Sequence, residues 1–96
     1  MNKSLVSCII PAYNEQGRIL NVLSAVIAAK SVDEIIVVDD CSEDKTSNDV
    51  RKIKDVKLLV NSKNLGKFGS LSRGVKLAKG DILLFLDGDL LGLTPV

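Results

Sequence analysis

Two aspartates separated by one glycine follow an apolar run near the end of this 96-residue chain. The run covers residues 82–86, and the carboxylates belong to Asp87 and Asp89. Such a run is typical of a strand buried on both faces of a parallel sheet, so we expect the carboxylates at the carboxyl edge of that sheet. Paired carboxylates suit a divalent cation that also binds phosphate oxygens. A plain polar turn is the alternative, because Asp-Gly is common in turns.

Three further polar clusters come directly after apolar runs. They are Pro-Ala-Tyr-Asn-Glu at 11–15, Asp-Asp-Cys-Ser at 39–42 and Asn-Ser-Lys-Asn-Leu-Gly-Lys at 61–67. Tyr13 offers an aromatic face to a base, and Asp40 offers a carboxylate to a base N–H or a ribose hydroxyl. Lys67 and the amides near Gly66 and Gly69, at the start of a predicted helix, can face phosphate. With a cation on the paired aspartates, these clusters predict a site for a nucleoside diphosphate.

Each cluster also has an ordinary structural explanation. Asp39 or Asp40 can cap the helix that follows, and Tyr13 can pack under a loop. Gly66 can hold a turn at positive φ, and Lys67 can be a solvated surface residue. We favour the binding site because all the clusters end strands of one predicted sheet and therefore share an edge. The opposite edge carries only ordinary turns.

Apolar periodicity predicts four strands and three helices in strict alternation. We expect strands at 5–10, 34–38, 56–60 and 81–86, and helices at 15–29, 44–53 and 69–79. Pro11 is expected to stop the first strand, Asn14 to cap the first helix and Gly80 to cap the third. The alternation predicts an α/β fold: a parallel sheet of order 3-2-1-4, half of a Rossmann fold, with helices on both faces. Sheets of this kind bind ligands at the reversal point, here between the first and fourth strands.

The composition excludes several classes of protein. With 46% hydrophobic and 26% charged residues and a net charge of +1, the chain is typical of a globular domain and lacks the basic runs of a nucleic-acid binder. It has no histidine, so acid–base and metal chemistry fall to carboxylates. Neither Gly-x-Gly-x-x-Gly nor a Walker motif occurs.

Several features indicate a cytoplasmic segment, which leaves membrane association of a longer protein open. No apolar run approaches the ~20 residues of a membrane helix. The first residues lead into a strand without a secretory signal. Cys8 and Cys41 are far apart, which fits a reducing compartment better than a disulfide framework. Cys8 lies in an apolar run and is expected to be a small buried thiol.

Taken in order, the motifs resemble those of family-2 glycosyltransferases, which have the GT-A fold. The resemblance rests on Ile-Ile-Pro-Ala-Tyr-Asn-Glu at 9–15, Val-Val-Asp-Asp-Cys-Ser at 37–42, Asn-Leu-Gly-Lys at 64–67, Gly-Asp at 80–81 and Asp-Gly-Asp at 87–89. It implies a nucleotide-sugar donor, commonly a UDP- or GDP-sugar, and Mg²⁺ or Mn²⁺. The donor-binding residues it implies are Pro11, Ala12, Tyr13, Glu15, Asp39, Asp40, Gly66, Lys67, Asp87 and Gly88, and the metal ligands are Asp87 and Asp89.

The implied reaction is transfer of a hexosyl-type sugar to an acceptor that the sequence does not identify. The metal would stabilise charge on the departing diphosphate. In most members a carboxylate deprotonates the acceptor, with inversion at the sugar.

Four departures from the family pattern matter. Cys41 stands where glycine is usual, and Ser70-Leu71-Ser72 replaces the common Ala-Leu-Asn. Phe68 replaces a small residue and is expected to narrow the approach to phosphate. The chain stops seven residues after Asp89, so we expect residues 1–96 to be the donor-binding part of a GT-A domain. It would lack the catalytic base and be inactive alone, and its fourth strand would be an exposed edge that invites self-association.

Two other functions are weighed against this one. A receiver-like phospho-switch would use the acid pair Asp39-Asp40 and a phosphoacceptor at Asp87, but that acid pair should end the first strand. A nucleotidyltransferase shares the nucleotide-binding sheet. It usually has a glycine-rich basic loop after the first strand, where this chain has Tyr-Asn-Glu-Gln.

Overall fold

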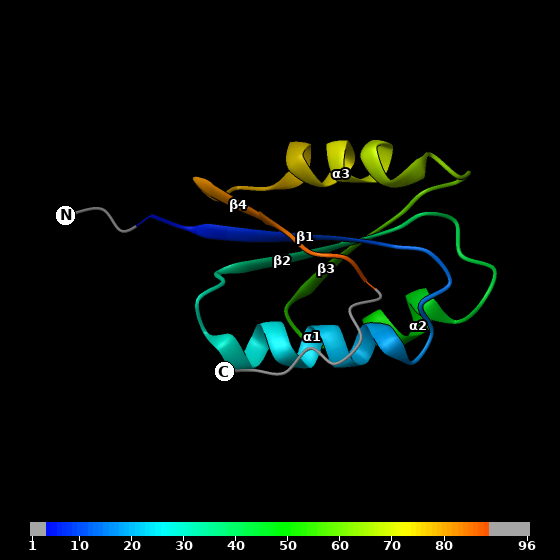
Figure 1. Ribbon diagram of the computed structural model, residues 1–96, viewed down its shortest axis with the longest axis horizontal. Helices are drawn as coiled ribbons and strands as arrows, with labels where there is room; N and C mark the ends of the chain where they lie inside the picture. The colour runs from blue at the N-terminus through cyan, green and yellow to red at the C-terminus, as the bar shows by residue number, and fades with distance from the viewer. Residues whose placement is uncertain (1–3, 89–96) are drawn as a thin grey trace.

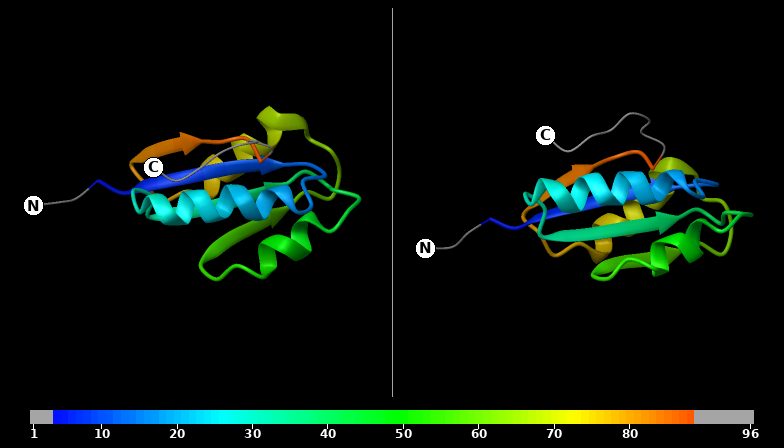
Figure 2. Two further views of the ribbon diagram at one scale, coloured as in Figure 1. Left: turned by 60° about the horizontal axis from the view of Figure 1, so that its bottom comes forward. Right: turned by 90° about the horizontal axis from the view of Figure 1, so that it is seen from below.

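The computed structural model describes residues 4–88, which form one parallel sheet with helices on both faces (Figure 1). The elements are β1 (Val6–Ala12), α1 (Arg18–Ala29), β2 (Glu34–Asp39), α2 (Thr46–Arg51), β3 (Val56–Val60), α3 (Gly66–Leu77) and β4 (Ile82–Phe85). The strand order is β3-β2-β1-β4, and α3 covers one face while α1 and α2 cover the other (Figure 2). The predicted α/β fold, with its half-Rossmann order, is confirmed. Within residues 4–88, no helix has both the length and the apolar character needed to cross a bilayer.

Two apolar cores hold the sheet between its helices. On the side of α1 and α2, the core includes Cys8 and Ile10 of β1, together with inward-facing residues of both helices. On the side of α3, Ile9 of β1 packs with Ile36 and Val38 of β2. Successive residues of these strands are therefore buried on opposite faces, which explains their continuous apolar sequences. Burial raises the pKa of the Cys8 thiol to about 11, so Cys8 acts as a small apolar residue, as predicted.

Pro11 was expected to stop β1, and this prediction is wrong because the strand continues to Ala12. The Ile9 carbonyl accepts a hydrogen bond from the Leu86 N–H, after β4, and the Ala12 carbonyl accepts one from the Asp40 N–H, after β2. Successive residues of β1 therefore face β4 and β2 in turn. Pro11 faces the β4 side, where the ladder has already ended at the pair of Ile9 with Phe85. The N–H that proline lacks therefore costs no ladder hydrogen bond. Beyond this point β1 and β4 are no longer paired as a ladder.

Two of the predicted helix caps are also wrong. The first helix begins at Arg18 rather than after Asn14, because the N–H groups of residues 14–17 bind side chains of a distant segment. The third helix begins at Gly66 and ends at Leu77, where Ala78 turns to an extended conformation, so Gly80 is not its cap. The second helix covers only residues 46–51.

The fourth strand was expected to be buried on both faces, and this prediction is wrong for the described residues. All four residues of β4 are exposed, from 36% at Leu83 to 50% at Ile82. The strand pairs only with β1, and the contacts of α3 with the sheet lie mainly on β1 and β2. The predicted exposed edge is therefore present.

A network of hydrogen bonds at the amino edge of the sheet joins β1, β2, β3 and the turn before β4. The Glu34 carboxylate accepts hydrogen bonds from the Ser7 hydroxyl, the Lys79 amide at 2.8 Å and the Lys57 ammonium. The Ser7 hydroxyl in turn accepts the Gly80 N–H at 2.8 Å. Burial alone would raise the pKa of Glu34, but these hydrogen bonds and the charge of Lys57 outweigh it and hold the pKa at about 2.

The ionised form of Glu34 should stabilise the fold in a pH-dependent way. Because its pKa in the folded chain is about 2 rather than 4.5, its contribution is complete above about pH 4.5 and is lost as the pH falls towards 2. We expect Glu34→Gln to lower the free energy of unfolding by about 2 kcal/mol near neutral pH. Urea unfolding of both chains should show this difference shrinking across the acidic range. A difference that stays constant across that range would contradict the assignment.

Gly74 should be required for the close contact between α3 and the sheet. A Cβ at this position would lie 2.4 Å from Cγ2 of Ile9 and 3.3 Å from Cγ2 of Val38. Alanine favours a helix over glycine by about 1 kcal/mol, yet we expect Gly74→Ala to destabilise the chain by about 1–3 kcal/mol through overpacking. Ser72→Ala, on the exposed face of the same helix, is the control and should be neutral or slightly stabilising. Urea unfolding of both variants checks the signs.

Candidate functional site

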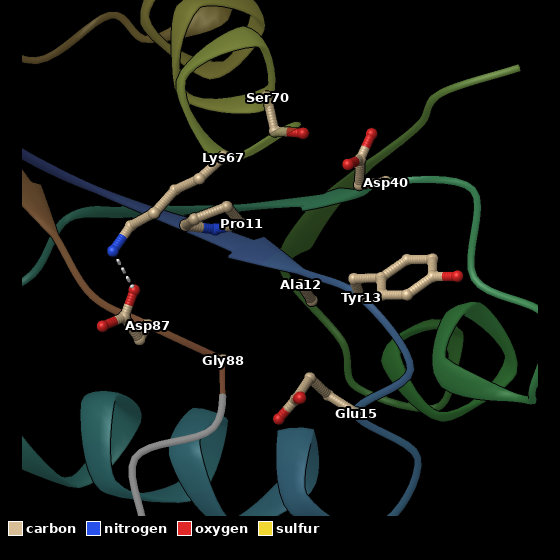
Figure 3. A pocket seen from close by; sticks show the side chains of 9 residues that line it. All are labelled: Pro11, Ala12, Tyr13, Glu15, Asp40, Lys67, Ser70, Asp87 and Gly88. Atoms are coloured by element: carbon tan, nitrogen blue, oxygen red, sulfur yellow. Dashed lines mark ion pairs between the residues drawn. The ribbon is translucent and has the colours of Figure 1, made fainter. Parts of the chain in front are cut away.

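A pocket of about 230 Å³ lies at the carboxyl edge of the sheet, where β1 and β4 separate (Figure 3). It is lined by Pro11, Ala12, Tyr13, Glu15, Asp40, Lys67, Ser70, Asp87 and Gly88. Every predicted donor-binding residue except Asp39 and Gly66 is in this lining. Complete small-molecule sites usually measure about 300–1,000 Å³, so the pocket has the size of part of such a site.

Ser70 lines the pocket although the sequence reasoning treated it only as a departure from the family pattern. It follows Lys67 by three positions on α3, and residues at that spacing lie on the same face of a helix. The helical spacing from Lys67 was therefore the signal that could have identified it. Its hydroxyl is buried and accepts a hydrogen bond from the Asn61 amide at 3.0 Å.

Asp40 lines the pocket and also holds the start of α3. Its carboxylate accepts hydrogen bonds from the N–H groups of Leu65 at 2.7 Å and Gly66 at 3.0 Å, and from the Asn61 amide at 2.9 Å. Burial alone would raise the pKa of Asp40. These hydrogen bonds and one from Ser70 outweigh it and hold the pKa below its usual range. Gly66, at a φ of 79°, thus contributes its N–H to Asp40 rather than a surface to the pocket.

Asp39 does not line the pocket. It is 2% exposed, and its carboxylate accepts hydrogen bonds from the N–H and hydroxyl of Ser42 and from the hydroxyl of Ser47 on α2. The bond to the Ser47 hydroxyl ties Asp39 to the following helix, but Asp39 does not cap that helix, whose N-cap residue is Lys45 and has no side-chain cap. The structure therefore separates the two adjacent aspartates: one faces the pocket, and the other lies behind it.

Lys67 and Asp87 face each other across the pocket, with 2.7 Å between Nζ and Oδ1 (Figure 3). Both side chains are about half-exposed, so this ion pair contributes little to stability. Gly88 lies next to them, so close to β1 that a Cβ would be 3.1 Å from the Pro11 carbonyl oxygen. The β4 side of the pocket therefore offers one carboxylate, one ammonium and a closely packed backbone.

The predicted metal pair is only half within the described structure. Asp87 lies at the pocket, whereas Asp89 lies outside residues 4–88. Within those residues no three acidic or cysteine side chains come together as a metal-binding group. Asp87 nevertheless fits a cation, because its accessible carboxylate faces the pocket and already pairs with a positive group.

Two other departures from the family pattern now have a structural description. Cys41 has a φ of 63°, the left-handed conformation that glycine adopts most readily, and its thiol lies 3.8 Å from the Ser62 carbonyl oxygen. Phe68 is 83% exposed and is not among the pocket-lining residues. Phe68 therefore forms no part of the pocket wall, and the expectation that it narrows the approach to phosphate stays a prediction.

The two aspartates of the pocket should differ in their effect on stability. Asp40→Asn removes one oxygen from a buried carboxylate that satisfies two backbone N–H groups, so we expect a loss of about 2 kcal/mol. Asp87→Asn breaks only a half-exposed ion pair and should cost less than about 1 kcal/mol. Urea unfolding without ligand measures both values. Equal losses would show that Asp40 does not hold α3 as described.

Comparison with known proteins gives consistent matches to one family. The model described as Glycosyl transferase family 2 matches residues 7–91. Glycosyltransferase AglE of Haloferax volcanii is 36% identical over 91 residues, which cover 88% of this chain and 30% of AglE.

Solved structures are similar to the same part of the chain. Residues 1–349 of S. aureus TarS in complex with UDP have a TM-score of 0.81 and 32% identity, over 88% of this chain and 27% of that TarS chain. The mannosyltransferase PcManGT from Pyrobaculum calidifontis, in complex with GDP-Man and Mn²⁺, has a TM-score of 0.80 and 28% identity, over 93% of this chain and 28% of PcManGT. The chain thus spans less than a third of the length of each of these proteins.

Proposed function

The chain belongs to glycosyl transferase family 2, and from this premise we propose that its pocket binds the nucleoside diphosphate of a sugar donor. One observation carries the proposal. Three strand ends and the start of α3, distant in sequence, contribute their predicted polar residues to one pocket. UDP in the TarS structure, and GDP-Man with Mn²⁺ in the PcManGT structure, support the choice of ligand class.

The pocket has two chemically different sides, and we assign the two parts of the ligand to them. Tyr13, Glu15 and Asp40 offer an aromatic face and carboxylates, which suit the base and ribose. Lys67 and the first turn of α3 offer positive charge and face the diphosphate. Pro11 and Ala12 line the pocket between the two sides, and Asp39 acts indirectly through the loop and helix that it holds.

A divalent metal would be held by Asp87 together with Asp89. When bound, Mg²⁺ or Mn²⁺ supplies Lewis-acid stabilisation of the charge on the departing diphosphate. The chain's own contribution is a carboxylate that faces the pocket and a neighbouring ammonium group 2.7 Å away that neutralises phosphate charge. Mn²⁺ in the PcManGT structure supports a divalent cation.

Three further proposals concern sugar transfer, cellular location and association with another strand. Transfer to an acceptor requires a catalytic base and an acceptor site that the family supplies beyond these residues, so the 96-residue chain should bind donor without transferring sugar. The two cysteines are free, which supports a cytoplasmic location. The apolar edge of β4 supports pairing with a further strand or with a second copy.

The family match favours this function over the two alternatives. A receiver-like domain would accept a phosphoryl group on Asp87, and acetyl phosphate would label it. A nucleotidyltransferase would require a glycine-rich basic loop after β1, where this chain has the loop containing Tyr13 and Glu15.

Calorimetry with UDP, GDP, TDP and CDP tests the proposed function. We expect at least one of them to bind the 96-residue chain, and Mn²⁺ to strengthen that binding, because the metal neutralises the diphosphate. Asp89→Ala should remove the effect of Mn²⁺ and leave the weak metal-free binding intact. Lys63→Ala, on a lysine outside the pocket lining, serves as the control. Absence of binding by the whole panel, with and without Mn²⁺, would contradict the proposal.

A further inference from the structure

The loop between β1 and α1 is held by side chains from a segment 28 to 32 residues further along the sequence. Four consecutive N–H groups, those of residues 14–17, each donate to a side-chain oxygen. The acceptors are Ser42 Oγ at 2.8 Å, Thr46 Oγ1 at 2.8 Å, Asp44 Oδ2 at 3.2 Å and Asp49 Oδ2 at 2.8 Å, in that order. We call these four side chains and the residues they hold the loop clamp.

The two hydroxyl groups of the loop clamp have fixed orientations. The Ser42 hydroxyl donates its proton to Asp39, and the Thr46 hydroxyl donates its proton to Asp44. Their remaining lone pairs are therefore directed at the loop, where each accepts one N–H. Burial raises the pKa of Asp44, but hydrogen bonds from Thr46 and from the Gln16 N–H lower it below its usual range, so Asp44 stays ionised as an acceptor.

The loop clamp also works in the opposite direction. The Asn14 side-chain oxygen accepts the Glu43 N–H at 2.8 Å, and the Gln16 side-chain oxygen accepts the Lys45 N–H at 3.1 Å. The two segments thus exchange hydrogen bonds and fix each other. This pairing accounts for the positive φ of 51° at Asn14 and for the late start of α1 at Arg18.

The loop clamp lies directly behind one wall of the pocket. Tyr13 is between Ala12, whose carbonyl accepts the Asp40 N–H at 2.8 Å, and Asn14, the first clamped residue. Glu15 is itself clamped through its N–H to Thr46, which is fully buried. None of the four holding side chains is in the pocket lining; Thr46 holds Glu15 directly, and Ser42 holds Asn14, the neighbour of Tyr13.

We infer that Ser42, Asp44, Thr46 and Asp49 are positioning residues, which order the β1–α1 loop before any ligand arrives and so preform the pocket wall of Tyr13 and Glu15. The inference rests on the proposed function, because it concerns the same pocket. Ordering a loop on binding costs conformational entropy for each residue fixed, and a preformed loop avoids this cost. The side chains that hold the loop therefore act on affinity without contacting the ligand.

Thr46→Val and Thr46→Ser form the matched pair that tests the inference. Valine has nearly the shape of threonine but leaves the Glu15 N–H without an acceptor, whereas serine keeps the hydroxyl. We expect Thr46→Val to speed amide hydrogen exchange at residues 14–17 of the ligand-free chain at least tenfold, and to weaken UDP binding with MnCl₂ by about tenfold. Thr46→Ser should restore most of both.

Ser7→Ala controls for a general loss of stability. It also removes a buried hydroxyl that accepts a backbone N–H, that of Gly80, but at the opposite edge of the sheet. Its melting temperature should fall as for Thr46→Val, while its UDP affinity and its exchange at residues 14–17 stay as in the wild type. If Thr46→Val does not fold, Ser42→Ala, which removes the acceptor for the Asn14 N–H at a less buried position, replaces it.

Two results would overturn the inference. One is unchanged exchange at residues 14–17 in Thr46→Val, and the other is an equal loss of UDP affinity in Thr46→Val and Ser7→Ala. If the wild-type chain itself binds none of the nucleotides, the proposed function is wrong, and the exchange measurement alone decides whether the loop clamp orders the loop.

Discussion

The loops at the carboxyl edge of the sheet have backbone N–H groups that need acceptors. Buried aspartates accept these N–H groups directly or orient a hydroxyl that does so. Asp40 accepts the N–H groups that begin α3, Asp49 accepts that of Gly17, and Asp39 orients Ser42, which accepts that of Asn14. An unsatisfied buried N–H costs about 1–3 kcal/mol, so the acceptors decide where each loop lies. The pocket lies between the loops that these aspartates hold, and its shape depends on them.

The fold was largely readable from the sequence because its two central strands, β1 and β2, are buried on both faces. β1 and β2 each contain an unbroken apolar run, at residues 8–12 and 35–38, and the alternation of such runs with amphipathic helices allows few arrangements other than a parallel sheet. The start of α1 was less predictable, because the backbone N–H groups of residues 14–17 donate to side chains of residues 42–49 and the helix begins only after them. The edge position of β4 followed from the predicted strand order, but its exposure on both faces did not, because an apolar run does not reveal what covers it.

The candidate site was predictable where position along a strand decides it. Residues that end parallel strands meet at one edge, and this rule correctly brought Tyr13, Asp40 and Asp87 to one pocket. The rule could not separate Asp39 from Asp40, because both follow the same strand and the difference lies in which neighbours each carboxylate reaches. Ser70 was missed for a related reason, since its place follows from the phase of α3.

The central strands pair with a neighbour on each side, whereas β4 pairs with β1 alone among the described residues. The two walls of the pocket therefore differ in the free energy needed to open them. Among residues 4–88, β4 is hydrogen-bonded to a strand along one side only and buries little apolar surface, so its detachment requires less free energy than that of β1 or β2. Such a fluctuation would carry away Asp87 and Gly88 and leave Tyr13 and Asp40 in place. The half of the cavity that belongs to β4 can therefore open at a lower free energy than the half that belongs to β1 and β2.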